Sequence, residues 1–222
     1  MVESTLRLLQ ATDSAPLADP PSPAWEPTPA PTDGAASLDR ESHLGVVIAA
    51  VAGTAWAQWG ASGVGGAVGW AIRLAGILVG LVIVIGSGRR WRRVAEAGHP
   101  RPAPRSGSKP IFPSPGFIVV NVLQVVALAG GARILTAAGH PDYLIAWSAT
   151  VVGLHFLALS RLSLPGLSWL GAALITAGAA GLAVGVCGGG PGGIKVASGL
   201  MAATSLFAAG GWSTARMLGG RP

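Results

Sequence analysis

The sequence predicts an all-α integral membrane protein: a bundle of six transmembrane helices in three antiparallel hairpins, with a disordered N-terminal tail. Half of the 222 residues are hydrophobic and only 11% are charged, whereas an ordinary soluble domain has about 25% charged residues. Seven of the nine acidic residues precede His43, so the remainder carries too few charges to solvate the surface of a soluble domain. Gly- and Pro-rich breaks divide the apolar remainder, residues 43–222, into spans.

Residues 1–42 form the predicted tail, which we place in the cytoplasm. They contain seven prolines and seven acids with little apolar content, so the segment cannot bury enough surface to fold and favours polyproline II structure. It lacks the basic start and apolar core of a signal peptide. Its Pro-Ser-Pro and Pro-Thr-Pro-Ala-Pro runs could dock a protein partner, although a solvated tether is the simpler interpretation.

Six helices of about the length needed to cross hydrocarbon are expected, at residues 44–61, 64–86, 117–138, 143–160, 167–187 and 194–218. A Gly-rich turn joins the first two into a hairpin. The proline-rich segment 110–116 cannot continue a helix, because proline lacks the amide donor and clashes with the preceding turn. The turn Gly139-His140-Pro141-Asp142, the break Leu164-Pro165-Gly166 and the Gly-rich turn at 188–193 separate the remaining spans.

The loop at residues 89–116 fixes the expected orientation. Its part 89–109 holds seven of the fifteen Lys and Arg residues and one acid, Glu96, and basic residues in short loops stay in the cytoplasm. Both termini and the turn beside Arg161 then lie inside, while Cys187 faces outside. Arg73, Arg133 and Lys195 are the basic residues left towards the outer side. Arginine far outnumbers lysine, as in GC-rich bacterial genomes, so we expect a bacterial plasma (inner) membrane.

The expected partners follow from the same charges. The bilayer is the main partner, and the basic segment 89–109 suits anionic lipid headgroups. The net charge of +6 does not indicate nucleic acid, because the basic residues flank apolar spans rather than line a soluble face. Glycines four residues apart allow close helix packing, which we expect to be intramolecular, with homo-oligomerisation left open: Gly65 and Gly69, Gly76 and Gly80, Gly181 and Gly185.

The third and fourth spans carry the best candidate polar site. Asn121 and Gln124 lie one helical turn apart on the third span, and His155 lies on the fourth. Counted from the inner ends of their helices, Gln124 and His155 lie at the same depth, about 9–10 Å below the inner surface. They are either a protonatable point in a transport pathway or an interhelical hydrogen bond that fixes packing. Arg73 joins this candidate site as a cation within the second span, without an evident partner in its own helix.

Arg133 and Asp142 flank the turn between the third and fourth spans, and we expect them to form an ion pair. No enzyme signature is present: the segment GGGPGGIK lacks the spacing of a phosphate-binding loop, and the four histidines lack the spacing of a metal site. A Ser–His–Asp assembly would need Asp142 beside His155, across the bilayer. We therefore expect no catalytic residues, no metal and no cofactor.

One segment resembles a known family. Residues 151–161, VVGLHFLALSR, are similar to the GLHFLPLAR-type segment that ends a transmembrane helix in small, uncharacterised multi-pass membrane proteins of bacteria, many of them actinobacterial. The similarity covers about residues 116–185, including PGFIVVNVLQVVAL, and His155 matches the family's histidine. The family pattern has an acidic residue at the position of Gln124 and proline at that of Ala158, which weakens a proton relay here. The resemblance implies the span boundaries but no activity.

Two functions remain open on the sequence alone. The first is a non-enzymatic membrane protein with a structural or accessory role. The second is a small transporter or channel with a polar path along Asn121, Gln124 and His155, and with Arg73 as a further candidate. Few ionisable groups and no clear internal repeat favour the first, whereas polar residues in hydrocarbon usually serve a function.

Overall fold

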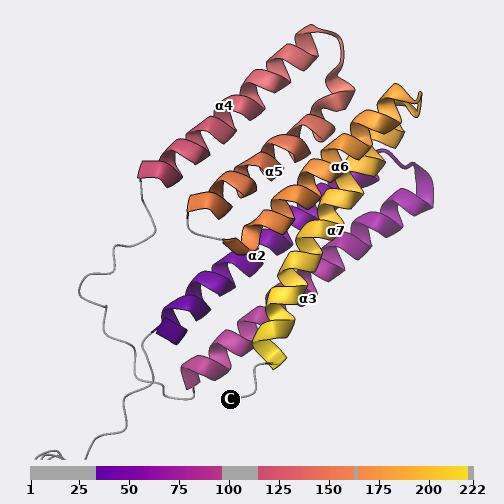
Figure 1. Ribbon diagram of the computed structural model, residues 1–222. Helices are drawn as coiled ribbons and strands as arrows, with labels where there is room; N and C mark the ends of the chain where they lie inside the picture. The colour runs from indigo at the N-terminus through magenta and orange to yellow at the C-terminus, as the bar shows by residue number, and fades with distance from the viewer. Residues whose placement is uncertain (1–33, 97–114, 163–164, 220–222) are drawn as a thin grey trace, which may run out of the picture. The chain divides into compact units, whose positions relative to one another are not determined.

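The computed structural model describes residues 34–96, 115–162 and 165–219, and these residues form helices joined by short turns (Figure 1). The elements are α2 (Gly34–Ala61), α3 (Gly66–Glu96), α4 (Pro115–Ala137), α5 (Leu144–Leu162), α6 (Ser168–Val186) and α7 (Gly190–Gly219), with two 3₁₀ helices, η1 (Pro141–Tyr143) and η2 (Pro165–Leu167). The described residues contain no strand, which confirms the all-α prediction.

Six segments of the described chain are long and apolar enough to cross a membrane: His43–Ala61, Gly66–Arg89, Pro115–Ala137, Pro141–Leu162, Ser168–Val186 and Gly190–Ala215. Each has about the 20 residues that span hydrocarbon. The fold is therefore that of a multi-pass integral membrane protein, with the number of spans that the sequence predicts.

Helices α2 and α3 are longer than expected. Helix α2 begins at Gly34 rather than 44, because Pro31 is the last proline before it and the following residues are ordinary helix formers. Helix α3 continues through the arginines to Glu96, since no proline intervenes before Pro100. The expected tail up to residue 33 and the loop segment 97–114 lie outside the described residues.

The turn between α6 and α7 is shorter than expected. Helix α7 begins at Gly190 rather than 194, because Pro191 falls in the first helical turn, where its missing amide hydrogen is not needed. The chain reverses at Gly188 and Gly190, which adopt φ of +80° and +65°, a conformation that glycine enters without steric cost.

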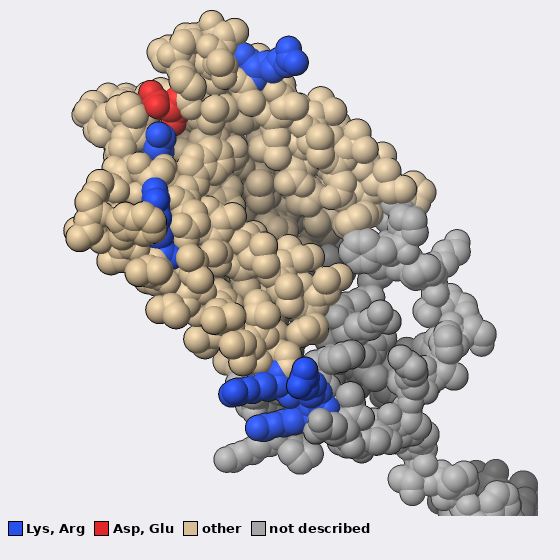
Figure 2. Space-filling model, turned by 180° about the vertical axis from the view of Figure 1, so that it is seen from behind, with Lys and Arg blue, Asp and Glu red and all other residues tan. Residues whose placement is uncertain are grey.

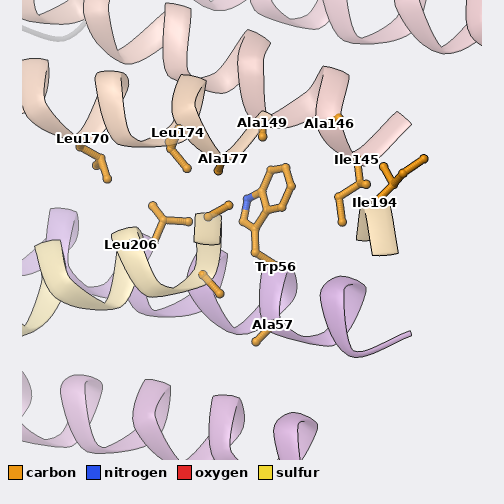
Figure 3. Packing of buried hydrophobic residues seen from close by; sticks show 12 residues of the cluster. Trp56, Ala57, Ile145, Ala146, Ala149, Leu170, Leu174, Ala177, Ile194 and Leu206 are labelled. Atoms are coloured by element: carbon orange, nitrogen blue, oxygen red, sulfur yellow. The ribbon is translucent and has the colours of Figure 1, made fainter. Parts of the chain in front are cut away.

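The helices pack in the order α4, α5, α6, α7, α2 and α3, so α4 and α3 lie at the two edges (Figure 1). Helix α7 is central, because it contacts α2, α6, α5 and α3. The main hydrophobic cluster combines α2, α5, α6 and α7, and Figure 3 shows Trp56 of α2 directed towards Ala149 and Ala177 on the neighbouring helices. A smaller cluster, made of Val46, Ala50 and Ile83, joins α2 to α3.

Glycine permits the closest helix contacts. Helices α2 and α7 meet at Gly60 and Gly199, and a Cβ added to Gly60 would lie 2.9 Å from the Leu200 amide nitrogen. Of the glycine pairs singled out in the sequence, two face other helices or turns as expected: Gly76 and Gly80 pack against Ala57 and Thr54, and Gly181 and Gly185 against Ser198 and Tyr143. Gly65 and Gly69 do not: no other residue is close to Gly65, and Gly69 lies against Val64 of the preceding turn.

Candidate functional site

The candidate polar site lies on the α4–α5 hairpin at one edge of the bundle. Helix α4 packs mainly against α5. In an 18-residue apolar stretch of α4 only 6% of the residues are buried, compared with 33% for the span that contains α5. Little apolar contact therefore holds α4 in place, so the polar contacts between the two helices contribute a large share of its attachment.

His155 of α5 reaches across to the backbone of α4. Its imidazole hydrogen-bonds to the backbone of Val120, and Nδ1 is buried without a hydrogen-bond partner among the described residues. The Val120 carbonyl can accept this bond because a carbonyl oxygen has two lone pairs and the helix uses one. The ring also contacts Phe156, with centroids 5.7 Å apart.

The expected bond between Gln124 and His155 is not formed within the described part of the chain. The histidine meets Val120, one turn away from Gln124 along α4. The offset from Gln124 to Val120 is about 6 Å along α4. Counting residues from the inner ends misses it, because the count does not contain the register between the two helices. The hairpin was predicted correctly, but the partner of His155 was wrong.

Asn121 and Gln124 do not form a joint polar site with His155. The Asn121 amide donates from Nδ2 to the Phe117 carbonyl of its own helix at 2.8 Å. Gln124 is half-buried, and the described residues offer its side chain no hydrogen-bond partner. The structure thus brings one of the three side chains into an interhelical bond and leaves the other two within α4.

Trp147 makes a second polar bond between these helices, which the sequence did not predict. Its indole Nε1–H donates to the Ala127 carbonyl of α4 at 3.1 Å. The ring lies against Gly131, where a Cβ would overlap the indole nitrogen. Because glycine has no side chain, the indole can reach the Ala127 carbonyl. Tryptophan near a helix end is commonly an interfacial anchor; the signal for a bond was the glycine at the matching depth of α4.

Arg73 has a partner in its own helix, contrary to the sequence interpretation. Its guanidinium carbon lies 5.3 Å from the centroid of the Trp70 ring, a cation–π contact. The i, i+3 spacing of Trp70 and Arg73 places them on one helix face and could have revealed this pair. The Arg73 carbonyl also accepts a bond from Gln58 Nε2 of α2 at 3.0 Å, which ties α3 to α2.

The expected ion pair between Arg133 and Asp142 is absent from the described residues. Arg133 is exposed on α4, whereas Asp142 is half-buried in η1, and η1 packs against α5, α6 and α7 as well as α4. The turn therefore holds Asp142 within the bundle while Arg133 extends outward. No cluster of three metal-binding side chains occurs among the described residues.

A groove of about 260 Å³ opens between α2, α4 and α5. It is lined by Ala55, Trp56, Trp59, Leu128, Ser148 and Val152, so the polar side-chain groups of its lining residues are the Ser148 hydroxyl and two indole N–H donors. Trp56 and Trp59 stack with centroids 5.6 Å apart and form one wall. None of the candidate polar residues Asn121, Gln124, His155 and Arg73 lines this groove.

Comparison with known proteins finds no matching family model, no matching curated sequence and no matching solved structure.

Proposed function

We propose that this protein is a non-enzymatic integral membrane protein with a structural or accessory role, in which intramembrane polar side chains hold helices together. We place it in a bacterial plasma membrane with both termini in the cytoplasm. The resemblance of residues 151–161 to small bacterial membrane proteins supports this placement and remains a prediction.

The observation that carries this proposal is that His155 and Trp147 connect two helices. Both side chains cross from α5 to donate to backbone carbonyls of α4, the helix with the least buried surface of the six. In hydrocarbon, such bonds contribute on average about 0.6 kcal/mol and at most about 1.7 kcal/mol each. Two of them add appreciably to the sparse packing between the helices, so an attachment role accounts for both residues.

Transport is the alternative, and one feature favours it. Nδ1 of His155 is buried without a hydrogen-bond partner in the described chain, and the half-buried Gln124 amide lies about one turn from Val120. A polar atom left free inside a bilayer is a position where an ion or proton could interact.

A flux measurement separates the two functions. The purified protein is reconstituted in liposomes that contain a pH-sensitive dye, and proton and ion gradients are imposed on wild type, His155→Ala and His140→Ala. His140 is the matched control, because it is an exposed histidine in a turn. We expect no protein-dependent flux from any of the three. Flux that His155→Ala abolishes and His140→Ala retains would replace the structural role with transport.

A further inference from the structure

Helix α3 continues past the membrane span at its C-terminal end. The apolar span ends at Arg89, and the helix runs on to Glu96. At 1.5 Å per residue, Arg89 to Arg93 cover about 6 Å along the helix axis. The headgroup layer beside the hydrocarbon is about 5–8 Å thick, so these residues lie at the depth of lipid phosphates.

Three arginines in this extension share one helix face. Arg89, Arg92 and Arg93 are spaced i, i+3 and i+4, which places them side by side, and all three are exposed. We call these residues the α3 arginine face. Figure 2 shows blue side chains gathered at one end of the described part, and a broad band nearly free of charge separates them from the charged residues towards the other end.

The α3 arginine face belongs to a strongly basic segment: residues 89–109 hold seven Lys and Arg residues and one acid, Glu96. Asp142 is the only acidic residue whose side chain is described, and it lies in η1, at the opposite end of the helices from the end of α3 (Figure 1). Positive charges therefore outnumber negative charges at this end of α3, beside its apolar surface.

We propose that the α3 arginine face binds the phosphate group of an anionic phospholipid. A guanidinium presents a planar fork of donors that matches phosphate oxygens in two parallel bonds. The lipid acyl chains would lie along the exposed apolar side of α3, where Leu78 and Val82 are 60% and 69% exposed. A single phospholipid can contact both the α3 arginine face and the apolar side of α3. A nucleic acid could bind the arginines but would leave the apolar side uncovered.

The test counts lipids bound to the full-length protein. The protein in detergent is titrated with dioleoyl-phosphatidylglycerol or dioleoyl-phosphatidylcholine, and bound lipids are counted by native mass spectrometry. We expect wild type to prefer phosphatidylglycerol. A basic residue at a membrane surface contributes about a fivefold change in affinity, so Arg92→Gln should weaken phosphatidylglycerol binding about fivefold and Arg92→Gln/Arg93→Gln about 25-fold.

Two controls make the result specific. Arg133→Gln removes an exposed arginine at the other end and should retain wild-type binding. Arg92→Lys/Arg93→Lys keeps the charge but removes the paired donors, and should bind with intermediate affinity. Equal binding of both lipids by wild type, or unchanged binding by the double Gln variant, would overturn the proposal. Tighter binding of a 20-nucleotide RNA than of phosphatidylglycerol would overturn it as well.

Discussion

Several polar side chains within the spans bond to backbone carbonyls. The hydroxyls of Thr150 and Thr214 donate to the carbonyl four residues earlier in their own helices, a local bond that satisfies the group without a partner helix. His155 and Trp147 donate across a helix pair instead. A short side chain can also cross between helices: the Thr54 hydroxyl lies 3.3 Å from the Gly76 carbonyl of α3, and Gln58 of α2 donates to the Arg73 carbonyl of α3.

Replacing Trp147 by Phe tests the interhelical bond. The substitution removes the Nε1–H donor to Ala127 while keeping an aromatic ring, so we expect a loss of about 1 kcal/mol in unfolding free energy. Unfolding of the purified protein by sodium dodecyl sulfate, followed by circular dichroism, measures it. Trp169→Phe is the control, because Trp169 is 47% exposed and makes no side-chain hydrogen bond among the described residues. Equal losses in the two variants would contradict a specific role for Trp147.

At the scale of elements, α2 and α7 pack through glycine, whereas α4 is attached by polar bonds. Gly60 and Gly199 let the α2 and α7 backbones approach closely, which gains dispersion contacts in the absence of a hydrophobic driving force between helices. Helix α4 presents exposed Val and Leu between Val119 and Val126 and makes few such contacts. Helix α4 is therefore less firmly attached to α5 than α2 is to α7.

Gly60→Ala tests the close contact between α2 and α7. The added methyl group would press on the backbone at Leu200, so we expect a loss of about 1–3 kcal/mol in unfolding free energy from overpacking. The control is Gly130→Ala, because no atom of another residue lies near that position on α4, and the better helix propensity of alanine should leave stability unchanged or slightly raised. A neutral Gly60→Ala would show that the helices do not pack at this point.

The sequence predicted the helices better than their contacts. Length and apolar composition are local properties, so the number and approximate bounds of the spans could be predicted. The extension of α3 through its arginines was missed because charge indicates where a span ends but not where a helix ends. The His155–Val120 and Trp147–Ala127 bonds depend on the register between two helices, and residue spacing within either helix does not contain that information.

At the scale of the whole molecule, charge sets the orientation that we propose. The exposed arginines Arg89, Arg92, Arg93 and Arg161 lie at the end of the bundle that we place in the cytoplasm, in agreement with the positive-inside rule. The turn between α6 and α7 lies at the other end, and it carries the exposed thiol of Cys187, which is the chain's single cysteine.

The membrane topology is the central claim, and labelling of Cys187 tests it most directly. Intact cells that express the protein are treated with a membrane-impermeant maleimide, with Cys187→Ser/Arg161→Cys as the matched variant that carries an exposed thiol at the inner end. We predict that wild type is labelled in intact cells and that the variant is labelled only after permeabilisation. Labelling of the variant but not of wild type in intact cells would contradict the orientation, and with it the assignment of the α3 arginine face to the cytoplasmic leaflet.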